Sequence, residues 1–243
     1  MHYHTNQIQS VNAITFDLDD TLWEIAPVIA RAEKKVYEVI QAQFPRVSER
    51  YTLKDIQKIR EQVLVSNPDI IHDLTEIRRL TFREMLSGCH YDPNQASVLL
   101  EQYMDWRHNV DFFVDVIPAL DLLSERYKLL TITNGNADVK RLGISQYFTA
   151  SISAGEFGTL KPDPRIFHYA CEILGEKPST ILHVGDNPSD DVIGALDAGF
   201  RAVWINRYRT VWKHPRSPDI EITSLTELVE FLDGPDYQQK ISI

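Results

Sequence analysis

Two aspartates, Asp17 and Asp19, come directly after a short run of β-branched and aromatic residues at positions 11–16. Such a run predicts a strand that is buried on both faces. In an extended backbone, a spacing of two residues points both carboxylates to the same side. Like charges this close need a metal ion, a lysine or a proton to compensate them, so such pairs are more often functional than structural. The pair therefore indicates a site at the carboxyl end of this strand, where ligands bind in open α/β sheets.

Three further polar residues lie where they would reach the same sheet edge. Thr133 and Asn134 close a predicted strand at residues 128–133, where the exposed N–H groups of a helix start would bind an anion. Lys161 lies in a proline-flanked segment ahead of a predicted helix, and it supplies a cation. A hydroxyl, an amide and a cation together suit a phosphate group.

Two more carboxylates, Asp186 and Asp191, follow a strand predicted at residues 180–184. With Asp17 and Asp19 they form an oxygen-rich set. This set suits Mg²⁺, because the ion prefers oxygen ligands and is commonly held by one or two carboxylates together with a substrate phosphate.

The elements that must position these residues follow from hydrophobic periodicity. Strands are predicted at residues 11–16, 128–133, 149–153, 180–184 and 202–205. Between the first two strands the pattern is helical throughout, with segments at residues 27–43, 53–66, 69–87 and 93–107. From residue 117 onward helices and strands alternate, with helices predicted at 117–126, from 137, at 165–174, at 189–198 and at 225–232. Such alternation predicts a parallel sheet.

We therefore expect an α/β fold with a doubly wound, parallel, five-stranded, Rossmann-like core. Residues 1–24 and 112–243 would form this core, and residues 25–111 would form an inserted all-α domain of four helices. The two connections between these domains, near residues 22–26 and 109–116, would act as hinges.

Composition and net charge limit the classes of binding partner that this chain is expected to have. Its 243 residues carry a formal net charge of -10 at pH 7, which argues against nucleic-acid and anionic-membrane partners. The only two cysteines, Cys89 and Cys171, match no metal-binding spacing and predict free thiols. With neither a signal-peptide pattern nor a long apolar run, we expect a cytoplasmic protein. The sequence does not predict an oligomeric state.

The order of these motifs resembles that of the haloacid dehalogenase (HAD) superfamily. That family has D-x-D-x-T, then a threonine or serine, then a lysine, then G-D-x4-D, and this chain has all four in order. An all-helical insertion directly after the first motif is similar to the C1-type cap of the family. Four motifs on the expected elements are a far more specific signal than one.

The resemblance implies a role for each matching residue. Asp17 would be the nucleophile that forms an aspartyl-phosphate. Asp19 would protonate the leaving oxygen and later activate water. Thr133 and the backbone N–H groups near Asn134 would hold the phosphoryl oxygens, and Lys161 would offset the charge of nucleophile and phosphate.

The resemblance also implies a Mg²⁺ cofactor. Asp17 and Asp186 would ligate the ion through their carboxylates, and Asp19 through its backbone carbonyl. Asp191 would ligate it directly or hold a metal-bound water. The expected activity is a phosphatase acting on a small-molecule phosphate ester.

Substrate specificity in capped members of this family is read by the insertion. The segments at 71–75, 106–107 and 132–136 resemble the bacterial flavin mononucleotide (FMN) and 5-amino-6-(5-phospho-D-ribitylamino)uracil phosphatase subgroup. Candidate substrate-binding residues are Trp23, His72, Arg78, Arg79, Trp106 and Arg107.

Three rival functions stay open. A dehalogenase is disfavoured by Asp19, because that branch dispenses with the second aspartate and the metal. A sugar phosphomutase would keep the same aspartates but return the phosphoryl group to a sugar. A non-catalytic aspartyl-phosphate signalling module is disfavoured by the intact catalytic positions and the large insertion.

Overall fold

The protein is built around a six-stranded parallel sheet with strand order β3-β2-β1-β4-β5-β6. The computed structural model describes residues 11–234. Its strands are β1 (Ala13–Phe16), β2 (Lys128–Thr133), β3 (Ala150–Ser153), β4 (Ile181–Gly185), β5 (Arg201–Ile205) and β6 (Ile220–Ile222). The α/β parallel fold is confirmed, with one strand more than the five expected. The extra strand, β6, has three residues, which is too short for periodicity to reveal.

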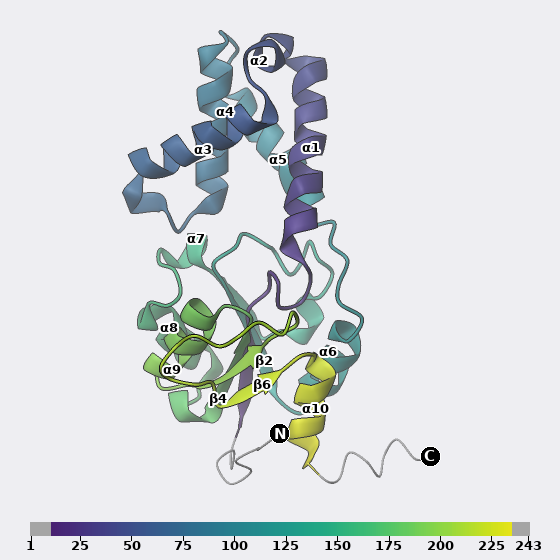
Figure 1. Ribbon diagram of the computed structural model, residues 1–243, viewed down its shortest axis with the longest axis vertical. Coiled ribbons are helices and arrows are strands. Elements are labelled where there is room, and N and C mark those ends of the chain that lie inside the picture. Colours follow the sequence, from purple (N-terminus) through teal and green to yellow (C-terminus); the bar gives the residue numbers. More distant parts are fainter. Residues whose placement is uncertain (1–10, 235–243) are drawn as a thin grey trace.

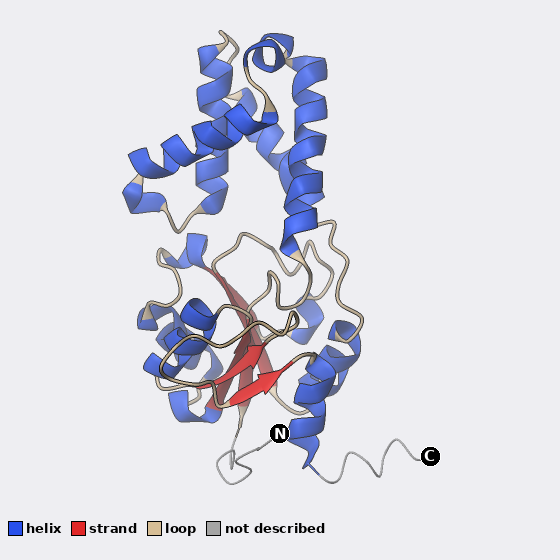
Figure 2. Cartoon of the chain, viewed as in Figure 1, coloured by secondary structure: helices blue, strands red, loops and turns tan. Residues whose placement is uncertain are grey.

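Helices cover both faces of this sheet, as Figures 1 and 2 show. One apolar cluster joins the sheet to α6 (Val116–Ser124) and α10 (Leu225–Asp233). A second cluster on the other face joins it to α8 (Pro164–Leu174) and α9 (Gly194–Asp197). The short helix α7 (Ala154–Phe157) follows β3 directly. Because β1 lies between the two clusters, all four of its side chains are fully buried, as its apolar run predicts.

The segment between β1 and β2 forms a separate group of helices, which we call the helical lobe (residues 25–107; Figure 1). Its helices are α1 (Ile25–Gln43), α2 (Pro45–Arg50), α3 (Leu53–Ser66), α4 (Leu74–Gly88) and α5 (Gln95–Arg107). They pack around an apolar cluster of their own. Four of them match the four expected helices, whereas α2 was not expected. It begins at Pro45, because proline is tolerated in the first turn of a helix although it disfavours the continuation of the helix before it.

Two predicted helices of the core differ in the structure. The helix expected from residue 137 is a series of turns. There Asp138 accepts a hydrogen bond from the Lys140 N–H at 2.8 Å and donates its own N–H to His108 Nε2 at 2.8 Å, and such bonds compete with helix formation. The helix expected at 189–198 begins as a wide π-helical turn, Pro188–Ile193, before α9.

The two connections between the helical lobe and the α/β core lie side by side. Trp23 and Phe112 form an antiparallel bridge, and the Phe113 N–H donates to the Leu22 carbonyl at 3.0 Å. Arg207, which follows β5, spans both connections: its guanidinium donates to the Thr21 carbonyl at 2.9 and 3.1 Å and to the Asp115 carboxylate at 3.1 and 3.2 Å. The chain thus enters and leaves the helical lobe at one place.

Cys89 and Cys171 are free thiols, as expected. Across residues 11–234, every helix is too short or too polar to cross a membrane.

Candidate active site

Lys161 lies at the centre of the charged groups at the carboxyl edge of the sheet. Its Nζ donates to Asp17 Oδ1 at 2.7 Å, to Asp191 Oδ1 at 2.6 Å and to the Ile132 carbonyl at 2.7 Å. Lys161 as a whole is 3% exposed, and Asp17 and Asp191 are buried as well. Residues far apart in the chain therefore meet because β1, β2 and β4 are neighbours in the sheet. The predicted grouping of Asp17, Lys161 and Asp191 is present.

Burial and charge shift the titration of this cluster in opposite directions. Burial raises the pKa of Asp17 well above its ordinary value, and the positive charge of Lys161 offsets only part of this. Burial alone would lower the pKa of Lys161, but the charges of Asp17 and Asp191 outweigh it and hold that pKa above its ordinary value. Burial alone would likewise raise the pKa of Asp191, but Lys161 and His183 hold it below the usual range. The lysine thus stays charged between two carboxyls, of which Asp191 is the firmly ionised one.

Asp186 completes a carboxylate cluster suited to a cation. Ligand oxygens of Asp17, Asp186 and Asp191 lie within 4.8 Å of one another. Burial, and then the charges of Asp191 and Asp20, raise the pKa of Asp186 to about 7. A bound cation would remove this penalty, because it favours the ionised carboxylate. The donor set, all carboxylate oxygen, fits Mg²⁺.

Both oxygens of Asp191 already have partners. Oδ1 contacts Lys161 and, at 3.3 Å, His183 Nε2, and Oδ2 accepts the Asn187 N–H at 2.9 Å. A Cβ on Gly185 would lie 2.2 Å from the Asp191 carboxyl carbon, so only glycine leaves room for this carboxylate. Asp17, by contrast, uses one oxygen on Lys161. The contacts therefore favour Asp17 and Asp186 as direct ligands, with Asp191 fixing the lysine and the loop.

The loop after β2 is tied to the loop that carries Lys161. The Asn134 side chain accepts the Lys161 N–H at 2.7 Å and donates to the Lys161 carbonyl at 3.0 Å. Thr133 Oγ1 accepts the Gly135 N–H at 2.9 Å and is buried. These bonds place a hydroxyl and a turn of backbone beside Asp17 and Lys161, where a phosphoryl group would be held.

Asp19 has a partner that the sequence did not predict. Nη2 of Arg107, the last residue of α5, donates to Asp19 Oδ1 at 2.7 Å and to Oδ2 at 2.8 Å. Burial raises the pKa of Asp19, and Arg107 counteracts part of that rise. From the sequence, Arg107 is expected only as a substrate contact. No local pattern connects two residues so far apart in the chain, and only the return of the chain to the core after residue 107 hinted at the site.

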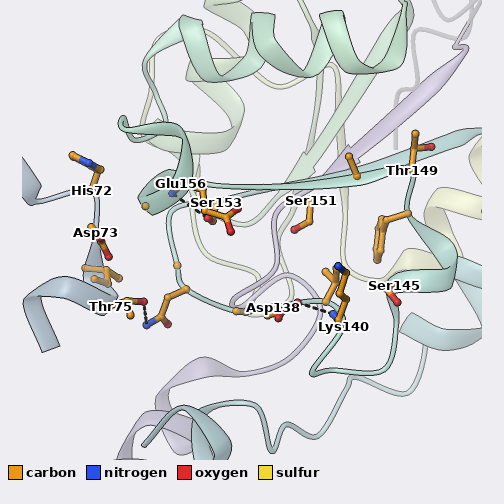
Figure 3. A pocket seen from close by; sticks show the side chains of 18 residues that line it. His72, Asp73, Thr75, Asp138, Lys140, Ser145, Thr149, Ser151, Ser153 and Glu156 are labelled. Carbon is orange, nitrogen blue, oxygen red and sulfur yellow. Dashed lines mark hydrogen bonds between the residues drawn. The ribbon is translucent and has the colours of Figure 1, made fainter. Parts of the chain in front are cut away.

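The structure places the predicted substrate-binding residues Trp23, His72, Arg78 and Arg79 in three different surroundings. Trp23 is fully buried beside Asp19, with which it forms a backbone bridge, and its ring packs edge-on against Phe112. His72 lines a cavity of about 700 Å³ between the helical lobe and the sheet (Figure 3). Arg78 and Arg79 are bound within the helical lobe.

Contacts within the lobe account for both arginines. Arg78 is buried, donates to Glu33 at 3.1 Å and to the Tyr103 hydroxyl at 2.9 Å, and stacks over the Tyr103 ring. Arg79 pairs with Glu76 one turn away on the same helix. These contacts explain both arginines as structural, and neither lines the cavity.

The cavity adjoins the catalytic edge through the loop after β2. Its walls come from the start of α4 and the loop before it, from residues 135–140, and from β3 with α7 (Figure 3). Most of the labelled side chains carry hydroxyl, carboxylate or amine groups: His72, Asp73, Thr75, Asp138, Lys140, Ser145, Thr149, Ser151, Ser153 and Glu156. A polar organic group would find many hydrogen-bond partners there.

Comparison with known proteins agrees with this geometry. A family model described as haloacid dehalogenase-like hydrolase matches residues 11–199. The 5-amino-6-(5-phospho-D-ribitylamino)uracil phosphatase YigB of Escherichia coli (strain K12) is 31% identical over 91% of this chain and 96% of its own. The human N-acylneuraminate-9-phosphatase is 29% identical over 97% of this chain and 99% of its own.

Among solved structures, one titled as a 2-haloacid dehalogenase from Pseudomonas syringae pv. Tomato DC3000 superposes with a TM-score of 0.86. It is 38% identical, and the match covers 91% of this chain and 98% of that one. Relatives therefore carry the names of two different hydrolytic activities, and only the site can separate them.

Proposed function

The chain belongs to the haloacid dehalogenase-like hydrolase family, and from its site we propose a Mg²⁺-dependent phosphatase that acts on small phosphate monoesters through an aspartyl-phosphate. The observation that carries the proposal is the buried set of Asp17, Lys161 and Asp186, with Asp19 two residues beyond the nucleophile. Phosphate hydrolysis requires a carboxylate nucleophile, a fixed positive charge, a site for a metal cation that favours the ionised form of the nucleophile, and a separate proton donor.

In the first step, an oxygen of Asp17 attacks phosphorus and the bond from phosphorus to the ester oxygen breaks. Asp19 gives a proton to that departing oxygen, so an alcohol leaves and a phosphoryl group stays on Asp17. Lys161 contacts the nucleophile at 2.7 Å and keeps a positive charge next to it. This charge lowers the repulsion between a carboxylate and a phosphate dianion.

Asp17 and Asp186 would hold Mg²⁺, which supplies further positive charge to the phosphoryl oxygens when bound. In the second step, Asp19 takes a proton from water, and the water oxygen attacks phosphorus. The bond from phosphorus to Asp17 breaks, inorganic phosphate forms, and the carboxylate of Asp17 is restored.

A haloacid dehalogenase is the alternative that the solved structure supports. Cleavage of a carbon–halogen bond needs an ionised nucleophile. It needs neither a proton for the departing halide nor a second carboxylate to hold a cation. The alkyl ester that then remains on Asp17 still needs a base to activate water, and Asp186 or Asp191 beside it could serve as that base. Asp19 as a proton donor would have no task in that reaction, whereas phosphate hydrolysis uses it to protonate the departing oxygen.

For the substrate, we propose an ester whose leaving group is polar and fills the cavity next to Gly135 and Asn136. The polar wall of the cavity supports this class. The name of the YigB relative supports 5-amino-6-(5-phospho-D-ribitylamino)uracil as the first candidate. We propose FMN, which also carries a ribityl phosphate, as the second.

The test measures inorganic phosphate and halide release in parallel. Wild type is given FMN, sugar phosphates, nucleotides, phosphoglycolate and 2-chloropropionate, with Mg²⁺ and with a chelator. Phosphate release that needs Mg²⁺ is expected, and preference for FMN would fix the substrate class. Chloride release without phosphate release would refute the phosphatase, and phosphate passing between sugars without release would identify a phosphomutase.

A further inference from the structure

Arg107 reaches from the helical lobe into the site and ends next to the proton donor. Its Nη2 bonds both oxygens of Asp19, and its Nε donates to Asn136 Oδ1 at 3.2 Å. The whole residue is 1% exposed. A planar guanidinium fixed at two corners by two different segments has one orientation, so the carboxylate that it holds has one as well.

The third corner of this guanidinium is free. Nη1 is buried and has no hydrogen-bond partner among residues 11–234. Buried charged N–H groups are rarely left without an acceptor. The guanidinium carbon lies 6.0 Å from the centre of the Trp23 ring, and Trp23 forms a backbone bridge with Asp19. An oxygen atom brought there by a ligand would complete the bonding of Arg107.

The surrounding backbone leaves room for this arrangement and for little else. A Cβ on Gly135 would lie 2.4 Å from Asp19 Oδ2 and 3.5 Å from Arg107 Nη2. Asn136, which receives the Nε bond, also donates to Thr75 Oγ1 at 3.2 Å across the lobe boundary. Gly135, Asn136 and Thr75 all line the large cavity. Arg107 itself does not line this cavity, and its guanidinium connects the proton donor to the cavity wall through Asn136.

We propose that Arg107 is a positioning residue that orients Asp19 for proton transfer and donates through Nη1 to an oxygen on the leaving group of the substrate. This inference rests on the proposed phosphatase function. It selects esters that carry a hydroxyl or carbonyl oxygen close to the ester oxygen, as polyol phosphates do. Because Arg107 belongs to the helical lobe, Asp19 is held in this way only while the lobe is docked on the core.

Two substrates separate orientation of the proton donor from general damage. Glycerol 3-phosphate has a poor leaving group, which needs a proton, and a hydroxyl next to the ester. 4-Nitrophenyl phosphate releases a stable phenolate, which needs little proton donation. Arg107→Ala is expected to lower kcat/KM by about 100-fold or more for glycerol 3-phosphate and by less than about 10-fold for 4-nitrophenyl phosphate.

Two further variants make the test specific. Arg107→Lys keeps the positive charge but loses the planar guanidinium with its several N–H donors. It is expected to show the same selective loss of kcat/KM for glycerol 3-phosphate. Added guanidinium, at concentrations that leave the fold intact, is expected to restore part of the glycerol 3-phosphate activity of Arg107→Ala and none of that of Arg107→Lys. Arg141→Ala is the matched control, because Arg141 also joins the core to α5, through Glu101 and Asp105, at the exposed surface. It is expected to leave both substrates unchanged.

Three results would overturn the proposal. Equal losses for both substrates in Arg107→Ala and in Arg107→Lys would show a role in docking or folding alone. Increased activity on glycerol 3-phosphate would show that Arg107 withholds Asp19 instead of orienting it. A wild type that releases phosphate from none of the esters, including FMN and the sugar phosphates, would refute the phosphatase function itself. An active wild type whose variants keep its ratio of activities on the two esters would refute only the role of Arg107.

Discussion

Replacing Lys161 with methionine is expected to destabilise the protein strongly, in addition to stopping catalysis. The methionine fills a similar volume but removes the charge that Asp17 and Asp191 contact at 2.7 and 2.6 Å. Both carboxylates are at least nine-tenths buried, so water cannot replace the ammonium group. Breaking a buried ion pair from one side costs about 3–5 kcal/mol, and the lost bond to the Ile132 carbonyl adds to this.

The loss of unfolding free energy in Lys161→Met is expected to depend on pH. Without Lys161 the pKa of Asp191 rises above its value in the unfolded chain, and the pKa of Asp17, which burial already raises, rises further. The loss of unfolding free energy is therefore greatest near pH 8, where both carboxyls must ionise, and it shrinks as the pH falls toward 5 and they bind protons. The assay is urea unfolding at 25 °C, in chelator so that no cation replaces the lysine, at both pH values.

Two controls define what would refute this reasoning. Lys128→Met removes a half-exposed pair with Glu176 and is expected to cost at most about 1 kcal/mol. Adding Asp191→Asn to Lys161→Met removes both partners, and the double variant is expected to be more stable than additivity predicts by about 1–3 kcal/mol. A Lys161→Met loss below about 1 kcal/mol, or strict additivity, would show that the cluster is not electrostatically coupled as described.

Three other predictions concern catalysis, the metal and the cavity. Asp17→Asn removes the nucleophile and is expected to lower turnover at least about 10³-fold, and residual activity above that level would exclude Asp17 as nucleophile. The same variant is expected to keep its unfolding free energy, because burial disfavours the charged carboxylate that it removes. Wild-type Mg²⁺ affinity, measured by calorimetry, is expected to fall about tenfold per pH unit below pH 7, because Asp186 with its pKa of about 7 must lose a proton to bind. In metal-free protein this raised pKa favours folding as the pH falls from 7 toward 4, and Asp186→Asn should abolish both effects. His72→Ala is expected to raise KM for the preferred ester with little change in kcat, whereas the exposed Arg83→Ala should change neither; equal KM values for both variants would remove His72 from the substrate site.

The grouping of polar residues at the carboxyl edge of the sheet was predictable, because the sequence itself shows where each of these strands ends. A buried apolar run followed by a polar residue fixes both the strand and the direction of its last side chains, as β1 and Asp17 show. The parallel arrangement then brings such ends together without any knowledge of the strand order. The same logic works for β2 with Thr133 and β4 with Asp186.

The contacts of the helical lobe were less predictable, because a helix presents arginines in the same pattern whatever they touch. Arg78 and Arg107 both follow apolar helical spacing. One is enclosed by Glu33 and Tyr103 within the lobe, and the other reaches Asp19 in the core. Tertiary packing decides which partner each arginine meets. Arg78 lies inside α4 within the lobe, whereas Arg107 is the last residue of α5, where the chain returns to the core.

The pairing of the two connections, Trp23 with Phe112, also bears on how the chain reaches its native state. Ala13 pairs with Lys128, about 115 positions along the chain, and closing so long a loop carries an entropic cost that slows sheet formation. The helical lobe has its own apolar core and local contacts, so it can form early and bring its two ends together. Once the lobe has folded, the effective length of the loop between β1 and β2 is that of the two short connections. The folded lobe therefore lowers the entropic cost of pairing these two strands.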